Sequence, residues 1–223
     1  PELLALLGIA QNRLDIERTP TVFLTQSPIL NASTFGAEEP TIIVHSGILD
    51  HLDDPTAVSV LGHELGHIHS DHSVYKLLAA VLIQSGVMFG AISKLLTTPI
   101  QLGLQKWSRC AELTADRAGL LACADVHASM DVLLRLAGGR SYGVYERTNL
   151  KIGPFVAQAR ELAKNENDNW LDGIVANWMN AYRSHPYAAW RMLHLLQWIE
   201  HGNYLDIISG NYKVDQNVNP KLN

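Results

Sequence analysis

The sequence has only two cysteines, Cys110 and Cys123, and both fall in a stretch with a helical pattern. A helix running from position 110 to position 123 would separate them by about 20 Å, which is beyond the reach of a disulfide. We therefore expect two free, buried thiols in place of a disulfide, which mildly favours a reducing compartment, cytoplasmic or membrane-associated.

Clusters of basic residues are also missing. The 17 Lys and Arg side chains are scattered and are outnumbered by 22 Asp and Glu, for a net charge of −5, so nucleic acid is not expected as a partner. There is no low-complexity tract and no internal repeat. No secretory signal stands at the start, but the chain opens on Pro1, so a removed pro-segment, leader or anchor stays open.

A hydrophobic run long enough to cross a bilayer is absent too. The most apolar segment, Leu77–Ile92, has 16 residues, including two glycines and a glutamine, whereas a span needs about 20. We expect this segment to be buried or covered by a partner. Peripheral membrane contact through Leu77–Leu104, interrupted at Thr97–Pro99, is the alternative.

The pattern along the chain predicts an α+β fold that is predominantly helical. A small antiparallel sheet of about three strands packs on a helix that Asp54 caps, Pro55 begins and His72 ends. The strands are expected at Val22–Thr25, Asn31–Phe35 and Thr41–His45, and the main later helices at Trp107–Ala124, Val126–Ala137, Phe155–Asn165, Trp170–Tyr182 and Pro186–His201. We predict one domain over 1–223, divided into 20–72 (the sheet and first helix), 73–106 (an apolar helical segment), 107–212 (a helical subdomain) and 213–223 (a polar tail).

The first of these helices carries the segment HELGH. His63 and His67 stand four positions apart, so on a helix they share one face and can bind a single divalent cation. Glu64 lies beside them, where its carboxylate can take a proton from an activated water. Gly62 and Gly66 weaken this helix, and they either keep its face open or admit a close neighbour.

A catalytic zinc normally takes three protein ligands, so one more residue is required. Glu112 and Asp116 are again four apart on an otherwise apolar and small-residue helix, and Glu112 could reach the metal while Asp116 fixes the tautomer of a ligating histidine. The alternative is a solvent-facing acid pair partnered by nearby arginines. His69 and His72 face away from the ligand pair and are expected at the surface or in a supporting position.

Four segments together extend this pattern: "NAST" before "TIIVHSGILDHL", then "HELGH", then "AELTAD", then "SHPYAAWR". In this order, from about Pro20 to Tyr212, the chain resembles the M48 metallopeptidases, zincins of the gluzincin type that include the CAAX prenyl protease and the HtpX protease. The resemblance implies one Zn²⁺ per chain with Glu112 as third ligand and Asp116 as its supporting partner. It also implies that His185 stabilises the oxyanion or closes the site as a fourth ligand, and that Arg191 holds the substrate backbone.

In similar zinc peptidases the strand with the Asn-Ala pair forms the sheet edge above the cleft, where a peptide substrate adds as a further strand. This resemblance makes Asn31, Ala32 and Ser33 the candidate substrate-binding residues. The family's usual aromatic residue after Asn-Ala is Ser33 here, and Phe35 follows two residues later, so the specificity contact is left open.

The sequence thus predicts a zinc metalloendopeptidase acting on unfolded or membrane-associated proteins, with Glu64 as general base and His185 and Arg191 as further catalytic residues. Two alternatives stay open: an autoinhibited or inactive, chaperone-like zinc protein, and an aminopeptidase. The expected partner is a polypeptide substrate.

Overall fold

A computed structural model describes residues 2–36, 38–72, 90–137 and 188–212, with isolated positions 74, 78, 81, 153, 154, 156, 157 and 160. Its elements, in chain order, are α1 (Glu2–Leu14), β1 (Thr21–Thr25), β2 (Ala32–Phe35), β3 (Thr41–His45), α2 (Ser46–His51), α3 (Asp54–His69), α5 (Gly90–Cys123), α6 (Val126–Ala137), α10 (Ala188–His201) and α11 (Tyr204–Ile208). The α+β prediction, mostly helical with three strands, is confirmed. The short helix α2 was not predicted.

The sheet is mixed, with the order β1-β3-β2. β2 pairs antiparallel with β3, as predicted, but β1 pairs parallel with it, so the prediction of an antiparallel sheet was wrong for this strand. β3 is the most buried of the three strands, and its Ile42 and Val44 are fully buried. Its central position lets it bond on both sides while β2 forms an edge.

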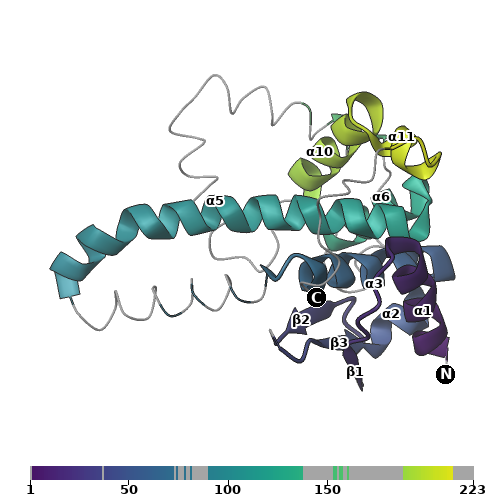
Figure 1. The fold of residues 1–223 in the computed structure, drawn as a ribbon, viewed down its shortest axis with the longest axis horizontal. Coiled ribbons are helices and arrows are strands. Elements are labelled where there is room, and N and C mark those ends of the chain that lie inside the picture. The colour runs from purple at the N-terminus through teal and green to yellow at the C-terminus, as the bar shows by residue number, and fades with distance from the viewer. Residues whose placement is uncertain are drawn as a thin grey trace.

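Helix α3 lies between the sheet and α5, so it is almost entirely buried (Figure 1). Its N-cap is Asp53, one residue before the predicted Asp54, and the Asp53 carboxylate accepts a hydrogen bond from the Thr56 backbone N–H at 3.1 Å. The helix ends at His69, earlier than the predicted His72. A turn then allows His72 to fold back toward the helix instead of continuing along it.

Helix α5 is continuous from Gly90 to Cys123 and extends beyond the rest of the described fold at one end (Figure 1). The predictions of an interruption at Thr97–Pro99 and of a helix start at Trp107 were therefore wrong. Both cysteines are free, as predicted, but only Cys123 is buried, whereas Cys110 is exposed. Proline in a helix interior costs about 3 kcal/mol, yet it does not have to end a helix. Within the part of the chain that the structure describes, no helix combines the length and apolar character needed to cross a bilayer.

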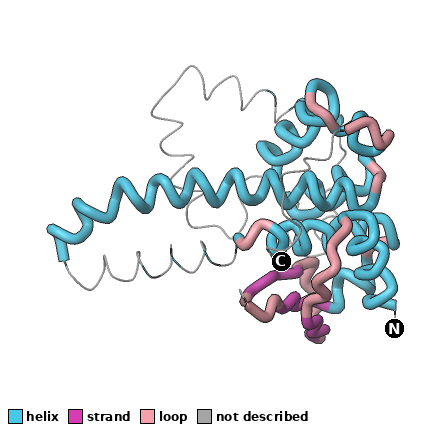
Figure 2. The backbone as a smooth tube through the Cα atoms, in the orientation of Figure 1, coloured by secondary structure: helices cyan, strands magenta, loops and turns pink. Residues whose placement is uncertain are grey.

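Helix α6 begins as predicted, with Asp125 accepting a hydrogen bond from the backbone N–H of Ala128. Helix α10 packs on α5 and α6, on the side of α5 away from the sheet (Figure 1). The tube in Figure 2 shows the same layers: strands at one side, and helices making up most of the described fold. Most of the predicted segments Leu77–Ile92 and Phe155–Asn165, and all of Trp170–Tyr182, His185 and 213–223, lie outside the described residues.

Candidate metal centre

Helices α3 and α5 bring two imidazoles and a carboxylate together. His63 and His67 come from one face of α3 and Glu112 comes from α5, and their ligand atoms all lie within 4.8 Å of one another. Glu112 Oε2 is 3.6 Å from His63 Nε2, and Glu112 Oε1 is 3.4 Å from His67 Nε2. All three residues are buried, so the alternative of a solvent-facing Glu112 is wrong.

This geometry fits a tetrahedral metal ion. Donors bound to zinc at about 2.1 Å lie about 3.4 Å from one another, close to the separations seen between Glu112 and the two histidines. His67 Nε2 is buried and makes no hydrogen bond within the described part of the chain. A buried polar atom without such a bond is unfavourable unless another group, such as a cation, binds it. The residue set can therefore hold a metal ion.

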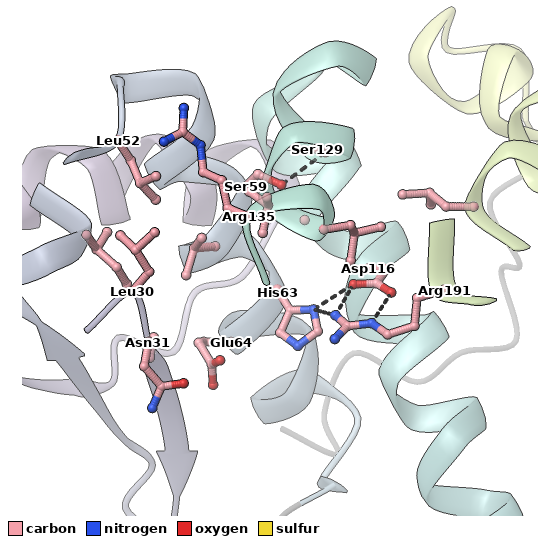
Figure 3. A pocket seen from close by; sticks show the side chains of 17 residues that line it. Leu30, Asn31, Leu52, Ser59, His63, Glu64, Asp116, Ser129, Arg135 and Arg191 are labelled. Atoms are coloured by element: carbon pink, nitrogen blue, oxygen red, sulfur yellow. Dashed lines mark hydrogen bonds and ion pairs between the residues drawn. The ribbon is translucent and has the colours of Figure 1, made fainter. Parts of the chain in front are cut away.

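Asp116 and Arg191 support the ligands from behind. His63 Nδ1 lies 3.1 Å from Asp116 Oδ1, and a proton there leaves Nε2 available to a cation. Arg191, on α10, donates through Nε to Asp116 Oδ2 at 2.8 Å and lies 3.5 Å from Glu112 Oε2. The buried Arg191 thereby connects α10 to both acids of α5. Figure 3 shows Arg191, Asp116 and His63 as one linked group.

The charges in this group explain the pKa shifts. Burial alone would raise the pKa of Asp116, but the charge and hydrogen bonds of Arg191, together with His63, lower it to about 2. Burial would lower the pKa of His63, but its hydrogen bond to Asp116 and the nearby Glu112 carboxylate raise it to about 9. For His67, burial prevails and lowers the pKa. In the metal-free site, a proton on His63 thus balances part of the carboxylate charge, and a bound cation would replace it.

His67 is held by a residue from just beyond its own helix. Its Nδ1 lies 2.8 Å from His72 Nδ1, and the buried His72 ring packs edge-on against Trp107 of α5 at 5.2 Å between centroids. With the proton of His67 on Nδ1, that nitrogen donates to His72 and Nε2 faces the metal site. His72 thus occupies the supporting position that was one of its two predicted alternatives, while His69 is exposed.

Glu64 lies on the strand side of His63, away from Asp116 and Arg191 (Figure 3). It is buried, at 4 % exposure, and the Thr34 hydroxyl on β2 donates to its Oε2 at 2.6 Å. The carboxylate is therefore fixed next to the metal site without being one of the three converging ligands. Such a placement suits a group that exchanges a proton with a reacting water.

A cavity opens beside Glu64 and His63 and extends between β2, α2 and α6. Asn31 and Ala32 line it, as does Arg191 (Figure 3). Much of its remaining wall is apolar and consists of Leu30, Ile48, Leu52, Val60, Val132, Leu133 and Leu195. Of the three predicted substrate-binding residues, the structure thus brings Asn31 and Ala32 to this cavity, whereas Ser33 is exposed and is not part of its lining.

Two polar contacts of the site were missed or left undecided by the sequence: Thr34 to Glu64 and His72 to His67. Strand alternation could have found Thr34, because it faces the same side of β2 as the buried Ala32. His63, His67 and Glu112 lie where they could hold one metal ion, and Glu64 lies beside them; their predicted roles stay predictions. Arg191 contacts the protein's own acids, and its predicted contact with substrate stays a prediction.

Comparison with known proteins places this site in a family. The profile of peptidase family M48 matches residues 5–199. The chain is 31 % identical over 209 residues to "Plastoglobule-localized metallopeptidase 48, chloroplastic" of Arabidopsis thaliana, an alignment that covers 93 % of this chain and 59 % of that protein. The chain therefore spans about three fifths of the length of this relative. No solved structure matches the present chain. The motif order, the converging ligands and the extent of the match together mean that the chain belongs to peptidase family M48.

Proposed function

We propose that this chain is a zinc-dependent endopeptidase. The observation that carries the proposal is the convergence of His63, His67 and Glu112, with Glu64 fixed beside them and a cavity at its side. Two neutral imidazoles and one carboxylate are a usual donor set for a catalytic zinc, which retains one position for water. Membership of a metallopeptidase family supports the same choice of reaction.

When bound, zinc polarises the scissile carbonyl and acidifies the attacking water. Glu64 accepts a proton from that water and passes it to the leaving amine. Asp116 keeps the proton of His63 on Nδ1, and Arg191 holds both Asp116 and Glu112 in place. The edge strand β2 binds the peptide backbone, which positions the carbonyl over the site.

We include His185 in the proposal as the residue that stabilises the charge developing on the carbonyl oxygen, with Arg191 contributing positive charge from behind the ligands. The family resemblance supports the role of His185, and the contacts of Arg191 with Asp116 and Glu112 support an indirect role. An unfolded polypeptide suits this site, because addition to an edge strand requires an extended backbone.

The test is the variant Glu64→Gln, which keeps the size of the side chain and removes its basicity. We expect the variant to bind one zinc per chain and to lose about 100-fold or more of its turnover on unfolded casein, since general base catalysis contributes about 10²–10⁴-fold. Zinc is measured by atomic absorption, and chelation should abolish the parent's cleavage reversibly. A Gln variant that cleaves at the parent rate would contradict the role of Glu64.

A peptide blocked at its N-terminus separates this proposal from the aminopeptidase alternative. An endopeptidase cleaves the blocked and free peptides alike, whereas an aminopeptidase leaves the blocked one intact. A zinc-loaded parent that cleaves neither peptide nor casein would favour the inactive, chaperone-like alternative.

We also propose peripheral contact with a lipid surface. Val74, Leu78 and Val81 are exposed apolar residues spaced four and three positions apart, as on one face of a helix. The relative from Arabidopsis thaliana is named for plastoglobules, which supports a lipid-associated location. This surface falls in the segment Leu77–Leu104 and its flank, for which the sequence predicted membrane contact as an alternative.

A further inference from the structure

Among the described residues of the sheet, Thr34 is the one whose side chain hydrogen-bonds to the side chain of Glu64, the proposed general base. Its hydroxyl donates to Glu64 Oε2 at 2.6 Å. The hydroxyl oxygen of Thr34 also lies 3.4 Å from the backbone carbonyl oxygen of Glu64. Because a hydroxyl has a single proton, the short contact to the carboxylate takes it. A hydrogen bond to an ionised acceptor at this distance is of the strong, charge-assisted kind.

This bond restrains the orientation of the Glu64 carboxylate. Thr34 occupies one acceptor position of Oε2 and thereby favours Oε1 as the oxygen that receives a proton from water. A glutamate has three side-chain torsions, and a single bond at its end selects among their rotamers. A free carboxylate would sample several orientations, and only some of them would direct an oxygen toward the reacting water.

Thr34 also occupies a special place on the edge strand. The His45 backbone N–H donates to the Asn31 carbonyl, and in an antiparallel pair such bonds recur at every second residue. Ser33 and Phe35 therefore direct their backbone groups toward β3, while Ala32 and Thr34 direct theirs away from it, toward the edge where a peptide would add. The side chain of Thr34 meanwhile points to α3 and Glu64.

We propose that Thr34 is a positioning residue that orients the Glu64 carboxylate and couples it to the strand that binds the substrate. This inference rests on the proposed peptidase function and adds a specific requirement to it. The backbone of Thr34 fixes the register of the bound peptide, and its hydroxyl fixes the base. A single residue thereby sets the position of the proton acceptor relative to the scissile bond.

The test replaces Thr34 with valine, which has nearly the same shape but no hydroxyl, and with serine, which retains the hydroxyl. We expect Thr34→Val to lower kcat by about tenfold or more, the worth of one charge-assisted hydrogen bond, with KM within about twofold. Thr34→Ser should keep kcat within about threefold of the parent. Thr25→Val, the same change at an exposed position of β1, is the matched control and should match the parent.

A second measurement does not depend on turnover. Crystal structures of metal-free Thr34→Val and parent should differ in the orientation of the Glu64 side chain, while zinc content after loading stays at one per chain. A residue that only ties the strand to the helix would lower stability without changing kcat or that orientation. Thr34→Ala serves the same comparison in case the valine variant does not fold.

The outcomes separate the inference from the proposed function. An active parent with an equally active Thr34→Val, or an unchanged Glu64 side chain in that variant, contradicts the inference alone. A Thr34→Ser variant that is as impaired as Thr34→Val contradicts the inference as well, because the hydroxyl group would then not be what orients Glu64. A zinc-loaded parent that cleaves nothing contradicts the proposed function, and the inference with it.

Discussion

Asp116 contacts both the candidate metal ligand His63 and the buried guanidinium of Arg191, so its charge affects the whole candidate site. We predict that Asp116→Asn lowers the free energy of unfolding of the metal-free protein by about 3 kcal/mol, because Arg191 loses the carboxylate that it binds. Denaturant titration at pH 7 measures this change. A loss below about 1 kcal/mol would mean that Glu112 alone compensates Arg191.

The same residue predicts an acid dependence. The pKa of Asp116 falls from 3.8 to about 2 on folding, so its ionised form stabilises the native state above pH 3.8, and this stability is lost as the pH falls toward 2. The free energy of unfolding of the metal-free parent should fall by about 2 kcal/mol from this cause. Asp116→Asn should lack this contribution to the pH dependence of stability. Parallel curves for the two proteins between pH 4 and pH 2 would contradict the shift.

At this scale the sequence was informative where chemistry and local spacing coincide. His63, Glu64 and His67 follow from one helical turn, whereas spacing alone left Glu112 as either a ligand or a surface acid. Only the family resemblance decided between them before the structure did. Strand alternation puts Thr34 on the same side of β2 as the buried Ala32. Its contact with Glu64, and that of His72 with His67, depend on how β2 and the turn after α3 dock on neighbouring elements, which no local pattern encodes.

At the scale of elements, the metal site depends on how closely α3 and α5 approach. A Cβ at Gly66 would lie 2.7 Å from Ala118 Cβ and 3.1 Å from Ala115 Cα, and a Cβ at Gly119 would meet the Ser59 carbonyl at 2.6 Å. Helices in such contact place their side chains at short range. Of the two predicted roles for the α3 glycines, admission of a close neighbour is therefore the one seen.

We predict that Gly66→Ala forces the two helices apart and moves Glu112 away from the histidines. The free energy of unfolding should fall by about 1–3 kcal/mol, despite the better helix propensity of alanine, and zinc affinity should fall as well. Gly103→Ala, also in a helix but with nothing within 4 Å of its Cβ, is the control and should be neutral or stabilising. Equal behaviour of the two variants, in denaturation and zinc titration, would contradict the close contact.

Element boundaries show where local signals suffice. The strands and the start of α6 were predicted within one residue because turn residues and caps mark them, as Asp125 does for α6. The parallel pairing of β1 was not predicted, because turn residues mark where a strand ends and do not determine the direction in which it pairs. The continuity of α5 through Pro99 likewise overrides a local helix-breaking preference.

At the scale of the whole molecule, the net charge disfavours electrostatic binding to lipid, whereas the exposed apolar residues favour binding by apolar burial. The net charge of −5 disfavours attraction to anionic headgroups, whereas burial of one exposed leucine is worth about 1.5–3 kcal/mol. Contact with lipid through Val74, Leu78 and Val81 would therefore depend on apolar burial. Such binding should be insensitive to salt.

We predict that the protein floats with phosphatidylcholine vesicles in a density gradient and that added phosphatidylserine does not increase the bound fraction. Leu78→Glu should lower vesicle affinity about tenfold or more, because it replaces an apolar contact with a charge. The matched control is Ile208→Glu on α11, since Ile208 and Leu78 are both 48 % exposed. Equal losses in the two variants would place the lipid contact elsewhere. Failure of the parent to float would contradict it altogether.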